Sequence, residues 1–418
     1  MNGDRSSHSC GSYQQWNRRR YLAGMSAAAL SGLWLTRFAE RLARAAEAKP
    51  SEHPKSLLIL WLQGGPSQLE TFDPHPGTTI GGEVRGISTS IPGVQIADTL
   101  PATAEQLRHT TLIRSLVSKE GDHERATYHL KTGWRPDPTL VHPAIGSIVC
   151  HQSPNNIEIP RHISVLPTQW PARGGYLGPS YDAFQIGDPL APIPNLTPRV
   201  PAETMATRRG LLLETVETEF QRGRLPQLNR QRTLHQTATE RAFQMMDSPQ
   251  LAAFDVQAEG TQTLARFGHT PFGRGCLAAI RLLSAGVRCV EVELDGWDSH
   301  INNHALQAGQ AKILDSALAA TLQELHARDL LEHTIVLCGG EFGRTPRINA
   351  AGGRDHWPQG FSALLAGGAF RRGYVHGATV AQPDPQQLER AKRDPQDRQQ
   401  WVTQPVSVPD LNATMLQA

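Results

Sequence analysis

The chain has 418 residues, a formal net charge of +2 at pH 7 and a charged fraction of 19%. This near-neutral balance gives no support for a nucleic-acid partner. Its five cysteines are odd in number and widely spaced, which is the pattern of neither a disulfide framework nor a zinc-binding motif.

The first 48 residues have the features of an export signal. Arg18-Arg19-Arg20 provides a twin-arginine pair, and Tyr21-Leu22 and a mildly apolar stretch at 23–35 follow it. That stretch is too short for a stable membrane span, which needs ~20 apolar residues. We therefore predict a Tat signal at 1–48, passage through the Tat translocase, and a periplasmic or secreted protein. An uncleaved amphipathic anchor is the alternative, because arginines follow the apolar stretch.

Residues 49–418 are predicted to form a single α/β domain that starts with a buried strand. Residues 56–62 are a continuous apolar run without alternation, as a strand covered on both faces requires. The tight turn Gln63-Gly64-Gly65 ends the run and leaves Ser67 near the strand's carboxyl end. Ser67 is a candidate nucleophile or ligand, although the pattern favours a turn or helix-cap role.

A second candidate motif, Gly121-Asp122-His123, follows a predicted strand at 111–115 and precedes a run of helical composition. Side chains at that place lie beside the free N–H groups of a helix N-terminus, which favours an anion. Asp122 and His123 are therefore candidate site residues. The alternative is that Asp122 only caps the helix while His123 lies on the surface.

The remaining chain predicts a helical insertion followed by alternating helices and strands. The block at about 203–256 is polar, rich in charge and helical in composition, so we interpret it as an insertion on the sheet. After it the sequence predicts a helix at 276–285, a strand at 287–294, a helix at 305–329, and strands at 334–338 and 361–366. This alternation predicts a mostly parallel sheet. A last helix begins at Val408 and stops at Ala418, which suggests a truncated carboxyl terminus.

Candidate metal ligands follow the predicted strand at 287–294. The loop Asp295-Gly296-Trp297-Asp298-Ser299-His300 places Asp298 and His300 two residues apart, and His304 comes soon after. Aspartate, histidine and glutamate are the usual ligands of zinc, manganese and iron. The alternative is that Asp298 caps a solvated helix, and for His304 a surface role is favoured.

A third group of polar residues follows the predicted strand at 334–338. Glu341 comes after two glycines, Arg344 is close behind, and His356 lies in a glycine-rich loop. Open α/β sheets keep their functional residues at the carboxyl ends of the strands, so we expect this group to meet the Asp298 loop. The alternative is a surface ion pair of Glu341 with Arg344, and packing of His356 on Trp357.

With these motifs in view, the chain resembles the DUF1501 family, which is uncharacterised and largely exported through the twin-arginine pathway. The resemblance covers residues 18–418 and rests on LWLQGGPSQLETFDP, GYLGPSYDAF, LDGWDSH, GGEFGRTPRIN and GRDHWPQGFSALLAGG. The family is in turn similar to the alkaline phosphatase and sulfatase superfamily. This implies an α/β/α sandwich with a mostly parallel sheet and metal ligands on strand-end loops.

The resemblance implies an exported hydrolase of phosphate or sulfate esters, acting on a small-molecule or polysaccharide ester. A divalent metal (zinc, manganese or calcium) would be held by four residues: Asp298, His300, Glu341 and His356. Asp122 and His123 would position the nucleophile or protonate the leaving group. Arg344 would hold an oxygen of the ester.

Two departures from the superfamily pattern suggest an alternative function. Gln63-Gly64-Gly65 occupies the place of the aspartate that usually ends the first strand. His123 fills the position of the sulfatase cysteine that becomes formylglycine, nine residues before Thr132-Gly133. Both argue against an ordinary formylglycine sulfatase. The alternative is a non-catalytic binding or assembly protein of the cell envelope that keeps the same fold.

Overall fold

The computed structural model describes residues 55–194, 196, 200–222, 234–368, 370–380 and 401–418. The predicted export signal therefore lies outside the described residues. Among the described helices, none is both long and apolar enough to cross a membrane.

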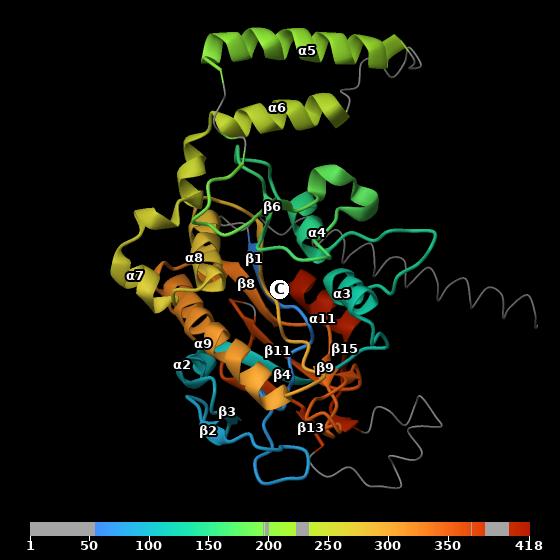
Figure 1. Ribbon diagram of the computed structural model, residues 1–418, viewed down its shortest axis with the longest axis vertical. Helices are drawn as coiled ribbons and strands as arrows, with labels where there is room; N and C mark the ends of the chain where they lie inside the picture. The colour runs from blue at the N-terminus through green and yellow to red at the C-terminus, as the bar shows by residue number, and fades with distance from the viewer. Residues whose placement is uncertain (1–54, 195, 197–199, 223–233, 369, 381–400) are drawn as a thin grey trace, which may run out of the picture. The chain divides into compact units, whose positions relative to one another are not determined.

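The described residues form a nine-stranded sheet whose centre is parallel (Figure 1). The middle strand β1 (Ser56–Leu62) pairs in parallel with β7 (Cys289–Leu294) on one side and with β8 (Thr334–Gly339) on the other. All of its residues are buried, which confirms the strand predicted from the continuous apolar run. Beyond β7 the parallel order continues through β5 (His162–Val165) and β6 (Phe184–Ile186).

One antiparallel strand interrupts the parallel order on the other side of the sheet. Strand β11 (Phe361–Ala366) runs antiparallel to both β8 and β4 (Thr110–Val117). Two short strands, β12 (Tyr374–His376) and β15 (Val406–Ser407), pair in parallel with β4. The predicted mostly parallel sheet is therefore confirmed.

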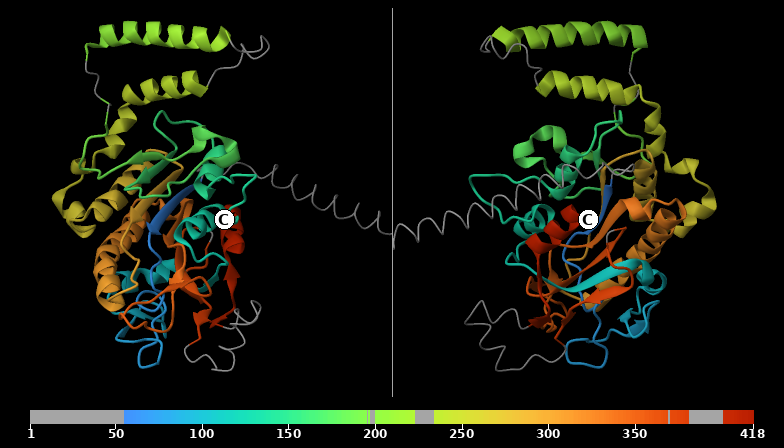
Figure 2. Two further views of the ribbon diagram at one scale, coloured as in Figure 1. Left: turned by 45° about the vertical axis from the view of Figure 1, so that its right-hand side comes forward. Right: turned by 180° about the vertical axis from the view of Figure 1, so that it is seen from behind.

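Helices cover both faces of the sheet, as Figures 1 and 2 show from three directions. One face is covered by α2 (Pro101–Gln106), α8 (Pro271–Ser284) and α9 (Asn303–Ala327), and the other by α3 (His123–Thr132), α4 (Ile145–Gln152) and α11 (Val408–Gln417). Side chains of β1 alternate between the two cores: Leu58 and Leu60 pack with the first set, and Ile59 and Trp61 with the second. This two-residue period is that of a strand between two helical layers.

The other elements are short, or belong to the block that the sequence marks as an insertion. That block contains α5 (Ala202–Arg222) and α6 (Leu234–Met246), and α7 (Thr261–Arg266) follows. Short antiparallel pairs are formed by β2 (Gly86–Ser88) with β3 (Gln95–Ala97), β9 (Gly343–Arg344) with β10 (His356–Trp357), and β13 (Ala378–Thr379) with β14 (Val402–Thr403).

Two leucines of α9 provide a test of which side of this helix is buried. Leu318 is 0% exposed in the core, whereas Leu306 on the same helix is 41% exposed. We expect Leu318→Ala to lower the free energy of unfolding by ~2–5 kcal/mol, because it leaves a cavity. The matched Leu306→Ala should change it by less than ~0.5 kcal/mol. Urea unfolding followed by circular dichroism measures both, and equal losses would contradict this orientation of α9.

Candidate metal centre

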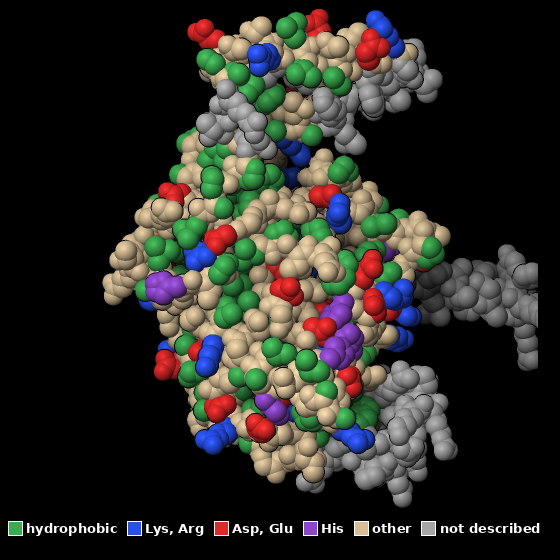
Figure 3. All heavy atoms as spheres, in the orientation of Figure 1, with side chains coloured by type: hydrophobic (Ala, Val, Ile, Leu, Met, Phe, Trp, Pro, Cys, Tyr) green, Lys and Arg blue, Asp and Glu red, His purple; other side chains and the backbone are tan. Residues whose placement is uncertain are grey.

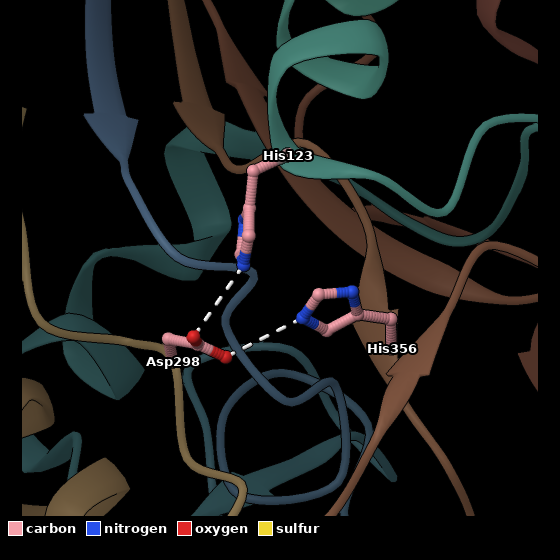
Figure 4. Close-up of side chains that lie close together, drawn as sticks. All are labelled: His123, Asp298 and His356. Atoms are coloured by element: carbon pink, nitrogen blue, oxygen red, sulfur yellow. Dashed lines mark ion pairs between the residues drawn. The ribbon is translucent and has the colours of Figure 1, made fainter. Parts of the chain in front are cut away.

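The loops that leave three neighbouring parallel strands meet at one edge of the sheet. In register, Leu62 of β1 lies beside Leu294 of β7, and Trp61 lies beside Gly339 of β8. The three strands therefore end side by side, as the sequence analysis expected. At this edge His123, Asp298 and His356 point toward one another from three separate segments of the chain (Figure 4).

Gly64 lets the loop after β1 approach the Asp298 loop after β7 closely. Gly64 has a φ of +109°, which L side chains rarely adopt, and a Cβ there would lie 2.6 Å from the backbone nitrogen of Asp298. The Trp297 N–H also donates to the carbonyl of Gln63 over 3.2 Å. The turn Gln63-Gly64-Gly65 thus packs directly against the Asp298 loop.

The Asp298 carboxylate is the centre of the cluster. Its oxygens lie 3.5 Å from Nε2 of His123, 3.5 Å from Nε2 of His356 and 3.2 Å from Nε2 of His300. The side chains of Asp298 and His300 are each 46% exposed, so the cluster is open to solvent. Figure 3 shows histidine side chains gathered beside acidic ones on one face of the molecule.

Each of these three imidazoles is held by its other ring nitrogen. The Nδ1 contacts are His123 to Glu341 Oε1 at 2.7 Å, His300 to Asp355 Oδ1 at 3.0 Å, and His356 to the Gly121 carbonyl at 2.8 Å. A carboxylate or carbonyl oxygen can only accept, so each Nδ1–H must donate. The Nε2 atoms are therefore left to face Asp298, the arrangement found behind metal-binding histidines.

A close pair of nitrogens tests whether a cation fits this cluster. Nε2 of His300 lies 3.0 Å from Nε2 of His356, and both rings already donate from Nδ1. Two lone pairs that face each other at this distance repel unless a proton or a metal ion lies between or beside them. Together with the adjacent carboxylate, these nitrogens are a donor set that fits a divalent transition metal.

The charges of the cluster are strongly coupled. Burial lowers the pKa of His123, but its hydrogen bonds to Asp298 and Glu341 outweigh that effect and raise the pKa to about 9. Burial raises the pKa of Asp298, yet hydrogen bonds from His123, His356 and Arg344 hold it far below its usual range. A metal must therefore displace a proton from His123, and it would find Asp298 ionised.

Glu341 lies behind His123 rather than inside the trio of donor atoms. It is fully buried, and its Oε1 accepts from the Gly64 N–H at 2.9 Å as well as from His123. Its Oε2 is buried without a hydrogen-bond partner among the described residues. The described donor group consists instead of His123, Asp298 and His356, so His123 enters as a ligand candidate that the sequence analysis had placed in catalysis.

Arg344 is fully buried, and its contacts lie inside the protein. The guanidinium donates to Asp298 over 2.6 Å, to the Gly65 carbonyl over 2.9 Å and to the Arg354 carbonyl over 3.1 Å, and it also donates to the Gly64 carbonyl. It therefore positions Asp298. The expected contact with an ester oxygen has no exposed atom of Arg344 available in this structure.

The structure places the other sequence candidates outside the cluster. Asp122 is the N-cap of α3 and accepts a hydrogen bond from the Arg125 N–H at 3.2 Å, which is the capping alternative. Ser67 is fully buried, and its backbone N–H donates to Gln307 Oε1 over 3.0 Å. His304 lies 3.2 Å from Glu70.

Three supporting groups were missed by the sequence analysis. Asp355 directly precedes His356 in the chain, so the Asp-His pair is a signal that could have found it. The Gly121 carbonyl has no side chain and gives no such signal. Gln307 was also missed: fully buried on α9, it donates to the Trp297 carbonyl at 3.0 Å and to Ser299 Oγ at 2.9 Å.

A second group of possible donors, His162, Cys289 and Glu291, is buried under α3 and α4. Lys131 of α3 already pairs with Glu291 at 3.0 Å. Burial raises the pKa of Cys289 well above its usual value, so the thiol stays protonated. This group is best explained as a buried ion pair that attaches α3, and hence His123, to β7.

The chain matches the model of a known protein family. The model of a family described as "Protein of unknown function (DUF1501)" matches residues 54–418. No curated protein matches the chain.

Several solved structures are similar in fold. The C-terminal periplasmic domain of EcEptC from Escherichia coli, in complex with Zn, has a TM-score of 0.41 and 10% identity, with 88% of this chain and 83% of that chain covered. The PsFucS1 sulfatase from Pseudoalteromonas sp. has a TM-score of 0.35 and 10% identity, covering 81% and 67%. A TAB5 alkaline phosphatase mutant with Mg bound has a TM-score of 0.33 and 12% identity, covering 78% and 94%.

The contacts of Arg344 lead to a stability prediction. Arg344→Met should lower the free energy of unfolding by ~3–5 kcal/mol, because it leaves Asp298 and several buried carbonyls without their partner. The matched variant Arg347→Met removes an exposed arginine of the same loop and should cost less than ~0.5 kcal/mol. Urea unfolding compares the two, and equal midpoints would show that Arg344 does not hold these loops together.

Proposed function

The chain belongs to the DUF1501 family, and we propose that it is an exported, metal-dependent hydrolase of phosphate or sulfate esters. The observation that supports this most is the convergence of imidazole Nε2 atoms on the Asp298 carboxylate, with each Nδ1 held from behind. A histidine that serves only as a surface residue does not need such an anchor. The proposal of export rests on the twin-arginine pattern of residues 1–48.

The residues that would hold the metal are His123, Asp298 and His356, with His300 adjoining them. Three nitrogens and a carboxylate favour zinc or manganese over calcium, which prefers an all-oxygen shell. Asp355 and Glu341 would tune the imidazoles from behind, because each accepts a hydrogen bond from an Nδ1–H and so orients the ring. Glu341 thus keeps a role in metal binding, but through His123.

A divalent cation at this place would polarise the ester and offset the negative charge that grows on the leaving oxygen. The chain's own groups prepare for that charge. Arg344 keeps Asp298 in place, and His123 is the first residue of α3, so its end of the helix turns free N–H groups toward an anion. Phe342 and Trp170 flank His123, with ring centroids 5.0 Å and 6.3 Å away, and shield this imidazole, whose side chain is 21% exposed, while the Asp298 side of the cluster stays open.

His123 cannot serve as a metal ligand and as a proton donor at the same time. Its Nδ1 is committed to Glu341, so one nitrogen, Nε2, remains for either task. We assign Nε2 to the metal because it faces Asp298 together with His356. Protonation of the leaving group then falls to solvent or to the substrate's own groups.

The test is the metal content and activity of the purified full-length protein, never exposed to chelator. We expect one or two equivalents of zinc or manganese by elemental mass spectrometry. Glu341→Gln should lower the metal affinity about 10–100-fold, because the neutral amide holds His123 less firmly. Hydrolysis of 4-nitrophenyl phosphate and 4-nitrophenyl sulfate should fall with it.

The matched control is Glu332→Gln. Glu341 follows strand β8, whereas Glu332 precedes that strand at its other end and is 53% exposed. This variant should keep both the metal and the activity. A well-folded wild-type protein without metal would overturn the hydrolase proposal. It would favour the non-catalytic envelope protein that the departures from the superfamily pattern suggest.

A further inference from the structure

Two large aromatic side chains are exposed near the metal centre. Trp134 is 60% exposed and Tyr176 is 61% exposed, while the other exposed large hydrophobic residues of the described chain are aliphatic. Tryptophan and tyrosine combine a broad apolar face with a polar edge, so their exposure suits a ligand with both characters.

His142 joins these two rings into one surface. Its ring lies 4.6 Å from Trp134 at an interplanar angle of 5°, and 6.0 Å from Tyr176 at 76°. We call Trp134, His142 and Tyr176 the aromatic platform. One face of the Trp134 ring is covered by His142, which leaves its other face for a ligand.

The backbone of the platform is held in place before any ligand binds. The Trp134 N–H donates to Thr132 Oγ1 at 3.0 Å, the His142 N–H donates to the Tyr128 hydroxyl at 2.7 Å, and the Tyr176 N–H donates to the Val141 carbonyl at 2.9 Å. A preorganised aromatic surface binds with a smaller loss of conformational entropy.

Two connections link the platform to the metal centre. Helix α3 begins at His123 and ends at Thr132, two residues before Trp134, so the platform lies about 15 Å along the helix axis from the cluster. The loop before Tyr176 carries Trp170, whose ring stacks on His123 at 6.3 Å and 11°. The helix and the loop therefore both connect the platform to the His123 imidazole.

The size and charge of this surface favour a saccharide chain over a protein partner. A stable protein interface buries about 800 Å² on each side, far more than three rings supply. A sugar ring presents an apolar C–H face that fits a flat aromatic ring, while its hydroxyls stay hydrated or bond to the polar edge. Arg135 pairs with Glu120 and Arg173 with Asp182, but their side chains stay 55% and 65% exposed, so each guanidinium still offers N–H groups to an anionic group on such a chain.

We infer that the ester hydrolysed at the metal centre is carried on a saccharide chain, and that the aromatic platform binds a sugar unit of that chain about 15 Å from the cluster. The link to catalysis rests on the proposed function. Binding of sugar by the platform does not, because it needs neither the metal nor turnover.

The experiment is affinity electrophoresis of the full-length protein in native gels. The gels contain dextran sulfate, chondroitin sulfate or heparin, or polyvinyl sulfate, a polymer that carries sulfate esters without sugar. At equal sulfate concentration, at least one polysaccharide should retard the wild type more than polyvinyl sulfate does. Trp134→Ala should weaken that retardation about tenfold, the size of one aromatic contact.

Two variants separate stacking from other effects. Trp134→Phe keeps an aromatic face and should retain most of the binding. Leu190→Ala removes an exposed apolar side chain elsewhere, 46% exposed, and should bind as the wild type does. Wild-type retardation of Trp134→Ala, or a wild type that the polysaccharides retard no more than polyvinyl sulfate, would overturn the inference. Binding that depends on Trp134 in a metal-free protein would keep the platform and overturn the hydrolase.

Discussion

The candidate metal centre depends on one buried cation. Arg344 is fully enclosed, and its guanidinium donates to carbonyl oxygens of the loop after β1, to the Arg354 carbonyl before β10, and to the Asp298 carboxylate after β7. A buried guanidinium is costly unless its N–H groups are paired, so none of these loops can move without leaving charge uncompensated. The ion pair with Asp298 therefore gives the carboxylate a defined place at the edge of the sheet.

Around this carboxylate, each of the three imidazoles is oriented by a contact at its other ring nitrogen, as a metal site would require. Each acceptor on Nδ1 comes from a different part of the chain: Glu341 after β8, Asp355 before β10, and the Gly121 carbonyl before α3. These contacts fix both the tautomer and the orientation of each imidazole ring. The candidate site thus depends on these acceptors as much as on the imidazoles, and both lie on loops positioned by the sheet.

The sequence alone was sufficient for the framework, and it indicated which polar residues lie at one edge of the sheet. Buried strands such as Ser56–Leu62 are covered on both faces, so their residues are apolar without interruption, and this local pattern is visible in the chain. Helix and strand alternation then predicted a parallel sheet. Asp298, His300, Glu341 and His356 were expected at one edge because functional residues of such sheets follow the carboxyl ends of strands. Their binding of a metal stays a prediction.

The tertiary structure decided what each of these residues does. Whether Glu341 meets a metal or supports His123 depends on a contact across 218 positions of the chain, and no local pattern encodes it. Arg344 was expected at an ester, but its burial among carbonyls of distant loops makes it a support for Asp298. The apolar pattern of a strand is local, so the sequence shows where each strand ends. It thereby determines which residues reach the edge of the sheet. Side-chain direction and burial, which assign the roles, arise only when the loops pack together.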